Sequence, residues 1–313
     1  MGLFSNKGPA IGIDLGTNNL LIYVRNEGIV VNEPTIIAMD SKTQKVLAVG
    51  EKAKAMQGRT HAGIHIVRPI RDGVITDFTA TSALLQHYVK ELSTKRFASR
   101  KPFIVVSMPT DITAVERRAV IEATIQAGAK EAIVVEDTVA AAIGAGLPVW
   151  EPTGSMIVDI GGGTTEVAII SLGGVVVSNS IKVGGDEMDQ LITKHVKNKH
   201  QLLIGEATAE HIKNNIFNEE QNGKMIVGGR DVVKGLPEKI ELTATEVEHV
   251  LKEAVDIIER GLLLSGGIAL LPWLENRISE ETKLPVILAE NPLENVVNGT
   301  AKIIENDNLK AFL

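Results

Sequence analysis

The sequence contains no cysteine among its 313 residues, and only 3% of them are aromatic. The missing cysteine excludes disulfide bonds and cysteine-ligated metals, and it is consistent with a reducing compartment. Because aromatic side chains are scarce, Ile, Val, Leu and Ala must fill the interior, which a hydrophobic fraction of 44% allows. A chain of this length is too long for one ordinary core, so we expect two lobes.

Other features are also missing. No apolar run approaches the roughly 18 residues that a membrane-spanning helix needs, and the N-terminus is too short and polar for a secretory signal. The net charge is −7 and no arginine-rich stripe is present, so nucleic acid is not an expected partner. The seven histidines show no ligand spacing, and we expect them at the surface or in the core.

The sequence does contain a glycine-rich turn between two apolar strands, in residues 157–170, IVDIGGGTTEVAII. Glycine weakens a strand interior, so three in succession indicate a tight turn, whose N–H groups can bind an anion. Asp159 ends the first strand, where a magnesium ion can lie between its carboxylate and a phosphate, because Mg²⁺ prefers oxygen ligands and retained waters. Taken alone, the segment is better explained as an ordinary Gly-rich β-turn.

The same pattern occurs a second time, in residues 10–24, AIGIDLGTNNLLIYV, where Asp14 matches Asp159. A supersecondary unit repeated about half a chain apart indicates duplicated lobes. Two such hairpins facing each other would hold a phosphate chain from both sides. The matched turns and matched aspartates make coincidence a poor explanation.

These hairpins resemble the phosphate-binding hairpins of the actin, sugar kinase and heat-shock chaperone ATPase superfamily. Further segments resemble, in order, the MreB family of bacterial actins: residues 68–78, 108–120, 140–174, 184–192 and 202–213. The resemblance extends from about residue 9 to residue 305. It implies an α/β, actin-like ATPase fold with two duplicated doubly wound lobes, a nucleotide cleft between them and two smaller outer subdomains.

The resemblance divides the chain into four subdomains: inner IA (residues 1–32 and 78–146), outer IB (33–77), inner IIA (147–183 and 256–313) and outer IIB (184–255). Local patterns agree with this division. Thr113 and Glu116 have capping-box spacing and open a helix that runs to Gly128. Residues 135–146 predict a helix of small residues, which suits either a hinge or simple tight packing, and residues 188–199 and 207–217 predict further helices.

The resemblance implies that the cofactors are ATP or ADP and Mg²⁺, with Asp14 and Asp159 holding the metal largely through water. The implied phosphate contacts are Gly16, Thr17, Asn18, Asn19, Gly161, Gly162, Gly163 and Thr164. The implied ribose and adenine contacts are Gly184, Gly185, Asp186, Glu210, Lys213, Gly266, Gly267 and Ile268. Ile268 replaces a glycine of the family, and Glu210 with Lys213 reads, without the resemblance, as a solvated helix ion pair.

Hydrolysis depends on a residue that orients water toward the γ-phosphate. By resemblance the family's glutamate falls at Asp137, whose carboxylate is withdrawn by about 1.5 Å, and a misplacement near 1 Å can cost about a hundredfold. Thr164 would hold the same water. Glu136 is a longer neighbour, but consecutive helical residues do not share a face. We therefore expect slow turnover, against the alternative that hinge flexibility lets Asp137 reach.

Three function classes compete. A small-molecule kinase needs an acceptor site with a base, which no segment suggests, and a chaperone needs a substrate-binding domain after the ATPase lobes. We expect a filament-forming ATPase whose main partner is itself, in paired protofilaments, and which governs cell shape at the inner face of the cell membrane. Leu3, Phe4 and Phe97, which lie near basic residues, are expected to touch anionic lipid, and the alternative is a solvated tail and loop.

One stretch departs from the family. Residues 246–267 pass directly from a helix into a strand, where the resemblance predicts another helix and connection of roughly 25 residues between Val255 and Asp256. Either the protein is shorter here or the sequence omits a segment. Omission is favoured, because removing a lobe helix would expose apolar sheet surface.

Overall fold

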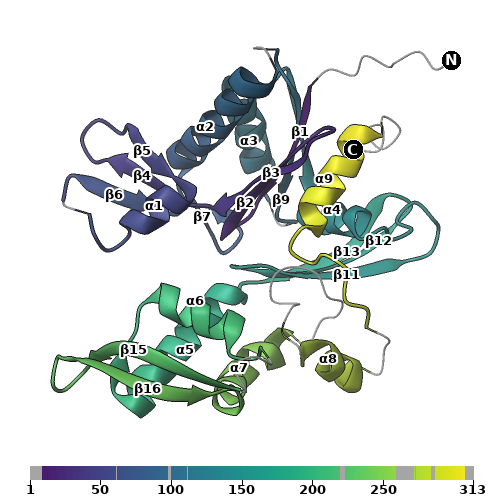
Figure 1. Cartoon of the computed structure of the whole chain (residues 1–313). Helices are drawn as coiled ribbons and strands as arrows, with labels where there is room; N and C mark the ends of the chain where they lie inside the picture. Colours follow the sequence, from purple (N-terminus) through teal and green to yellow (C-terminus); the bar gives the residue numbers. More distant parts are fainter. Residues whose placement is uncertain are drawn as a thin grey trace.

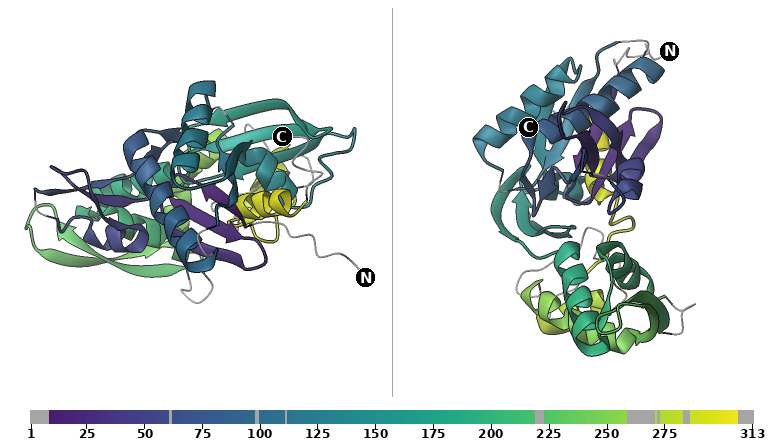
Figure 2. Two further views of the ribbon diagram at one scale, coloured as in Figure 1. Left: turned by 90° about the horizontal axis from the view of Figure 1, so that it is seen from above. Right: turned by 90° about the vertical axis from the view of Figure 1, so that its left-hand side faces the viewer.

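The computed structural model describes residues 9–60, 62–97, 100–110, 112–218, 223–258, 271, 273–282 and 286–306. These residues form two bodies, one containing residues 9–184 and the C-terminal helix, the other containing residues 185–282 (Figure 1). The view from the left-hand side shows the two bodies joined by a narrower region (Figure 2).

The upper body is built on a five-stranded sheet in the order β10-β9-β1-β2-β3. Its strands are β1 (Ala10–Leu15), β2 (Asn19–Val24), β3 (Gly28–Pro34), β9 (Phe103–Met108) and β10 (Glu131–Glu136). Strands β1, β9 and β10 run parallel, whereas β1, β2 and β3 form an antiparallel meander. The helices that cover the sheet are α2 (Phe78–Arg96), α3 (Ala114–Gln126), α4 (Asp137–Gly144) and α9 (Asn295–Glu305).

Alternate residues of β1 face opposite sides of this sheet, as expected for an extended strand. Ile11 and Ile13 pack into the core that contains α2 and α3, whereas Ala10 belongs to the core that contains α4 and α9. A sheet covered on both faces is the doubly wound arrangement, which the resemblance implies for both inner lobes.

The second sheet repeats the first meander. It contains β11 (Ser155–Ile160), β12 (Thr165–Ser171) and β13 (Gly174–Ile181), which pair antiparallel in that order. Ile157 packs with α4 and α9, whereas Val158 packs with the helices of the lower body. Helices α4 and α9 therefore lie between the two sheets.

Small residues bring α4 and α9 into close contact, as expected for a helix in residues 135–146, although α4 begins only at Asp137 because Val135 and Glu136 end β10. A Cβ at Gly144 would lie 1.8 Å from the carbonyl oxygen of Asn295, and one at Gly299 would lie 1.7 Å from that of Ala140. Only glycine fits at these two positions.

The remaining described elements fall into two outer groups (Figure 1). One contains β4 (Ile37–Asp40), β5 (Val46–Val49), α1 (Gly50–Met56), β6 (Ile64–Val67) and the short hairpin of β7 (Ile70–Arg71) and β8 (Val74–Ile75). The other contains α5 (Gly185–His200), β14 (Leu202–Leu203), α6 (Glu206–Asn215), β15 (Lys224–Asp231), β16 (Pro237–Thr243), α7 (Ala244–Ile258) and α8 (Leu274–Thr282).

The structure tests several local expectations. Thr113 and Glu116 form the predicted capping box at the start of α3, with both reciprocal hydrogen bonds present. Helix α7 is continuous through Val255 and Asp256, so the chain as given has no additional helix between them, and the omission of a segment there stays a prediction. In the described part of the chain, no helix combines the length and apolar character that crossing a bilayer requires.

Phe97 is expected at a membrane surface, and this expectation is wrong. Its side chain is only 8% exposed and packs in the core with β1 and α2. Phe97 follows the last turn of α2 and continues the buried stripe of Val89 and Leu92, so burying its ring outweighs exposing it beside Arg96. Leu3 and Phe4 lie outside the described residues.

Candidate functional site

The ends of three parallel strands bring polar side chains together at one edge of the first sheet. Asp14 of β1 lies opposite Ser107 of β9, and Val135 of β10 lies opposite the same serine. Asp137 begins α4, immediately after β10. Because parallel strands end at a common edge, Asp14 and Asp137 converge there.

The second lobe adds two more carboxylates, Asp159 of β11 and its cross-strand partner Glu166 of β12. Burial and the nearby charge of Asp159 raise the pKa of Asp14 to about 8, against a hydrogen bond from Ser107 that lowers it. Burial, Asp14 and Glu166 likewise raise the pKa of Asp137 well above its ordinary value. Buried carboxylates that repel one another in this way are suited to a cation, and an all-oxygen set suits Mg²⁺.

The two predicted hairpins touch each other. A Cβ at Gly162 would lie 2.4 Å from Nδ2 of Asn18, and one at Gly163 would lie 2.8 Å from the Cα of Asp72 and 3.0 Å from Cγ2 of Thr17. The glycines are therefore required for the turn of the second lobe to approach the turn of the first. The two repeats of the sequence therefore lie against each other, one from each lobe.

The first hairpin is held by neighbouring polar groups. The Thr35 hydroxyl donates to the Gly16 carbonyl at 2.8 Å, and Thr17 Oγ1 accepts from the Gly73 N–H at 3.3 Å. Asn18 Nδ2 donates to Asp186 at 2.8 Å, and Asn19 is the first residue of β2.

The start of α5 lies directly against the second hairpin. The N–H groups of Gly185 and Asp186 donate to the carbonyls of Gly161 and Gly162 at 3.1 and 2.8 Å. A Cβ at Gly184 would lie 2.7 Å from both of these carbonyl oxygens. The hairpin and the helix N-terminus thus form one continuous backbone surface, and the positive end of a helix favours an anion.

Glu210 and Lys213 do not pair as a simple helix ion pair, because each has its own partner. Lys213 is buried, donates to the Gly185 carbonyl at 2.9 Å and lies 2.8 Å from Asp189. Burial raises the pKa of Asp189 to about 6, although Lys213 opposes the shift. Glu210 lies 3.1 Å from Lys54 on α1.

Ion pairs also connect the two outer groups of elements. Arg68 lies 3.8 Å from both Asp186 and Glu206. The ion pair of Lys54 with Glu210 adds a third link of the same kind. All three pairs run from the outer elements of the upper body to helices α5 and α6 of the lower body.

Asp137, which the resemblance predicts to orient water, has neighbours that were not expected from the sequence. Glu166 is buried and accepts from the Thr110 hydroxyl at 2.7 Å and from the Thr110 N–H at 3.1 Å. The same hydroxyl lies 3.0 Å from that of Thr138. Glu136 lies 3.9 Å from Arg117 on α3. A glutamate inside the apolar strand TEVAII is the sequence signal that identifies Glu166.

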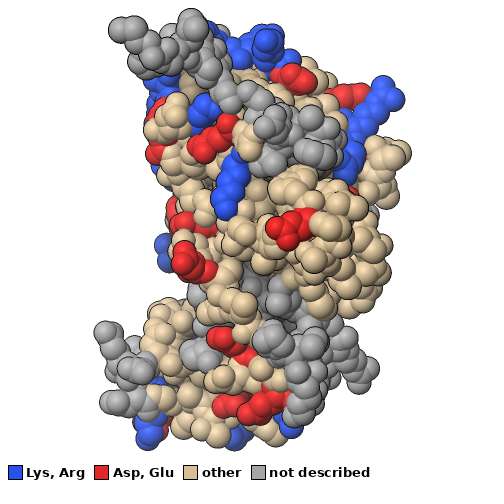
Figure 3. Space-filling view, turned by 90° about the vertical axis from the view of Figure 1, so that its right-hand side faces the viewer, with Lys and Arg blue, Asp and Glu red and all other residues tan. Residues whose placement is uncertain are grey.

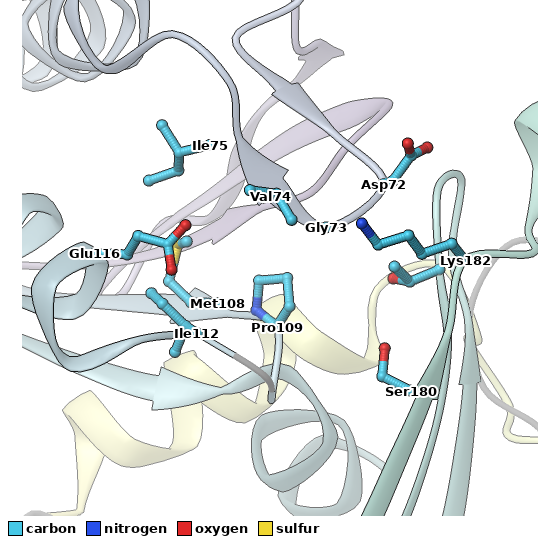
Figure 4. Close-up of a pocket in the computed structure, with 11 residues that line it drawn as sticks. Asp72, Gly73, Val74, Ile75, Met108, Pro109, Ile112, Glu116, Ser180 and Lys182 are labelled. Atoms are coloured by element: carbon cyan, nitrogen blue, oxygen red, sulfur yellow. The ribbon is translucent and has the colours of Figure 1, made fainter.

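Thr164 borders a cavity of about 90 Å³ between the lobes (Figure 4). The turn between β7 and β8 contributes Asp72 and Gly73, the segment after β9 contributes Pro109, and Lys182 follows β13. A Cβ at Gly73 would lie 2.9 Å from the Thr164 methyl group. The remaining predicted nucleotide residues, Gly266, Gly267 and Ile268, lie outside the described residues.

Comparisons with known proteins agree with this arrangement. The family model for the MreB/Mbl protein matches residues 8–311. The chain is 44% identical to the cell shape-determining protein Mbl of Bacillus subtilis, over 95% of this chain and 96% of the relative. It is also 44% identical to the cell shape-determining protein MreB of Escherichia coli, over 97% and 94%. These alignments span 319 and 331 positions, so the relatives contain residues without a counterpart in the 313 residues here.

Solved structures show the same similarity. The MreB5 protein of Spiroplasma citri bound to AMPPNP is 34% identical, with a TM-score of 0.88 over 98% of this chain and 99% of that chain. The MamK double helical filament has a TM-score of 0.76 at 18% identity, over 95% and 99%, which concerns the fold alone. The expected actin-like fold is confirmed, and the chain belongs to the MreB/Mbl protein family.

Proposed function

We propose that this protein is a bacterial actin that binds Mg-ATP between its lobes and polymerises into filaments that govern cell shape. The observation that carries the proposal is the direct contact of the two glycine hairpins, with four carboxylates gathered behind them. The similar MreB5 of Spiroplasma citri is described as bound to AMPPNP and to ADP, which supports a nucleotide at this position.

In this proposal Asp14 and Asp159 hold Mg²⁺, largely through water. The ion supplies positive charge that neutralises the phosphate oxygens and orients them. The turn of Gly161–Gly163 binds the phosphates, and the positive end of α5 lies beside it, although the Gly185 and Asp186 N–H groups donate to the turn itself. Lys213 and Glu210 lie near the nucleoside. Loss of either aspartate would leave the other carboxylates repelling the phosphates.

Slow ATP hydrolysis is the second part of the proposal. Asp137 replaces the longer glutamate of the family, and it is fixed at the first turn of α4 between buried neighbours. Glu136 is directed toward Arg117 of α3, so it is not positioned to take over. Thr164 holds the attacking water from the opposite lobe.

Assembly is supported by the relatives and by the surface. Mbl and MreB are named cell shape-determining proteins. Val176 and Val177 on β13 and Leu172 in the turn between β12 and β13 are exposed, and the middle of the face seen in Figure 3 is largely uncharged. Exposed apolar side chains on a sheet edge favour pairing with another copy.

Membrane association is proposed for the N-terminal residues alone, since Phe97 is buried. Leu3 and Phe4 precede Lys7 in the sequence, and apolar residues beside a cation suit an anionic bilayer. A filament would display many such segments, so weak individual contacts would add up. The protein would then act in the cytoplasm, at the inner face of the membrane.

The test is sedimentation of the purified chain with Mg-ATP, followed by electron microscopy of the pellet. We expect the protein to pellet as filaments with Mg-ATP and to remain in the supernatant without nucleotide. A protein that binds Mg-ATP but stays monomeric at all concentrations would contradict the filament proposal and favour a kinase or chaperone-type ATPase.

A further inference from the structure

Two histidines and a glutamate meet in the lower body, at the opposite end of α5 from the candidate nucleotide site. His195 Nε2 lies 2.7 Å from Oε1 of Glu246, and His200 Nε2 lies 2.6 Å from the same oxygen. The two imidazole rings are 6.1 Å apart at an interplanar angle of 69°. One ligand atom from each residue lies within 4.8 Å of the others.

The cluster is formed by two helices. His195 and His200 lie in the last part of α5, and Glu246 lies in the first turn of α7. The α7 start has capping-box spacing, Thr243 to Glu246, and the Thr243 hydroxyl accepts from the Glu246 N–H at 3.2 Å. The Glu246 side chain, however, is directed to the imidazoles and is only 13% exposed.

We propose that His195, His200 and Glu246 form a binding site for a divalent transition-metal ion of the zinc class. Two imidazoles with one carboxylate are a ligand set that zinc uses, with water completing a tetrahedron. Imidazole ligands suit zinc, copper and nickel, whereas Mg²⁺ favours oxygen. The site is therefore chemically distinct from the all-oxygen cluster between the lobes.

The observed distances require only a small adjustment. Ligand atoms at about 2.1 Å from a tetrahedral ion are roughly 3.4 Å apart, so each imidazole Nε2 must move about 0.7–0.8 Å away from the carboxylate oxygen. Each imidazole can be neutral with its hydrogen on Nδ1, which leaves the Nε2 lone pair for the metal. Rotation of partly exposed side chains supplies this movement.

Lys199 competes with a metal ion for Glu246, and this competition gives the proposal a specific test. Its ammonium lies 3.1 Å from Oε1 of Glu246, where its charge would repel a cation. The Lys199 side chain is 56% exposed, so it can turn to solvent when a metal binds. Removing it should strengthen metal binding, an effect that scattered surface histidines would not give.

A metal here would tie the C-terminal end of α5 to the start of α7. The two helices already pack together through Ile192, Val196 and Val247, and they are neighbours in Figure 1. The N-terminus of α5 contacts the second glycine hairpin. The ion would thus fix the far end of the helix whose other end lies at the candidate nucleotide site.

The experiment is a Zn²⁺ titration of the full chain by calorimetry, in excess Mg²⁺ and without nucleotide. Excess Mg²⁺ occupies carboxylate sites and should leave this site free. We expect one Zn²⁺ per chain. His195→Gln and His200→Gln should each weaken binding by at least about tenfold, since changes outside the ligand shell alone cost about 10- to 100-fold. Glutamine can keep the hydrogen bond to Glu246, so the fold should survive.

Two further variants make the result decisive. Lys199→Ala should tighten Zn²⁺ binding, whereas His211→Gln on α6, outside the cluster, should leave it unchanged. Cobalt(II) bound in place of zinc should give the visible absorption of a tetrahedral site, and the two cluster variants should lose it. Absence of stoichiometric Zn²⁺ binding, or equal affinity in wild type, His195→Gln and His200→Gln, would overturn the proposal.

Discussion

Asp137 is the residue on which the proposed turnover rate depends. Replacing it with glutamate should restore the reach of the carboxylate toward the γ-phosphate. We expect Asp137→Glu to increase phosphate release during assembly by about tenfold or more, because misplacement near 1 Å can cost about a hundredfold. ATP affinity should change little.

Asp137→Asn is the matched control, because it keeps the short side chain and removes the charge. It should release phosphate no faster than wild type. Turnover that is equal or lower in Asp137→Glu would contradict the reach argument and indicate that Asp137 already reaches the water.

Asp14 makes the nucleotide-free protein sensitive to pH. Its pKa is raised to about 8 by burial and by Asp159, above the ordinary value near 3.9. A raised carboxyl pKa stabilises the folded state at low pH, and that contribution is lost as pH rises from about 4 to 8. The urea midpoint of the nucleotide-free protein should therefore fall between pH 5 and pH 8.

Asp14→Asn should reduce this fall, because asparagine does not ionise. At pH 5 most of the wild-type Asp14 is protonated, so the two proteins should differ least there, and at pH 8 the variant should be the more stable. Parallel midpoint curves for the two proteins would show that Asp14 does not cause the pH dependence.

The site residues that can be predicted from the sequence are those that lie in the repeated strand–turn–strand pattern. Asp14 and Asp159 are predicted because each follows an apolar strand and precedes a glycine turn. Glu166 has no such marker beyond its place in an apolar strand, and its partner Thr110 comes from another element. Phe97 was misplaced because nearby basic residues suggest exposure, whereas its burial depends on the end of α2.

At the scale of elements, the contact of α4 with α9 is the most sensitive to change. A Cβ at Gly144 or at Gly299 would collide with backbone atoms of the other helix. Overpacking costs about 1–3 kcal/mol, and backbone is less able to move than a side chain. We expect Gly144→Ala and Gly299→Ala each to lower the free energy of unfolding by about 2 kcal/mol or more.

Gly228→Ala on β15 is a suitable comparison, because no atom lies within 4 Å of its added Cβ. Urea unfolding followed by circular dichroism measures all three variants. Unchanged midpoints for Gly144→Ala and Gly299→Ala would show that the helices can separate without loss.

Local signals predict elements better than they predict contacts between elements. The capping box of Thr113 and Glu116 is contained in four residues, and the structure confirms it. His195, His200 and Glu246 have no recognisable spacing, because the third ligand comes from a helix 46 residues after His200. The sequence therefore could not indicate that these histidines would meet.

At the scale of the whole molecule, we predict that the N-terminal residues attach assembled filaments to anionic membranes. Deletion of residues 2–7 should prevent assembled protein from floating with liposomes that contain anionic lipid, whereas sedimentation with Mg-ATP should persist. Phe97→Ser should lower stability through loss of core packing rather than act on the membrane. Equal flotation of the deletion variant would contradict a role for Leu3 and Phe4.

The central claim is that two hairpins from two lobes form one Mg-nucleotide site that drives assembly. The most direct test is the affinity for Mg-ATP, measured by calorimetry, for wild type, Asp14→Ala and Asp159→Ala, with Glu241→Gln on β16 as a distant control. We predict that each aspartate variant loses affinity by about tenfold or more and no longer pellets with Mg-ATP, while the control behaves as wild type. Unchanged Mg-ATP affinity in both aspartate variants would contradict the account.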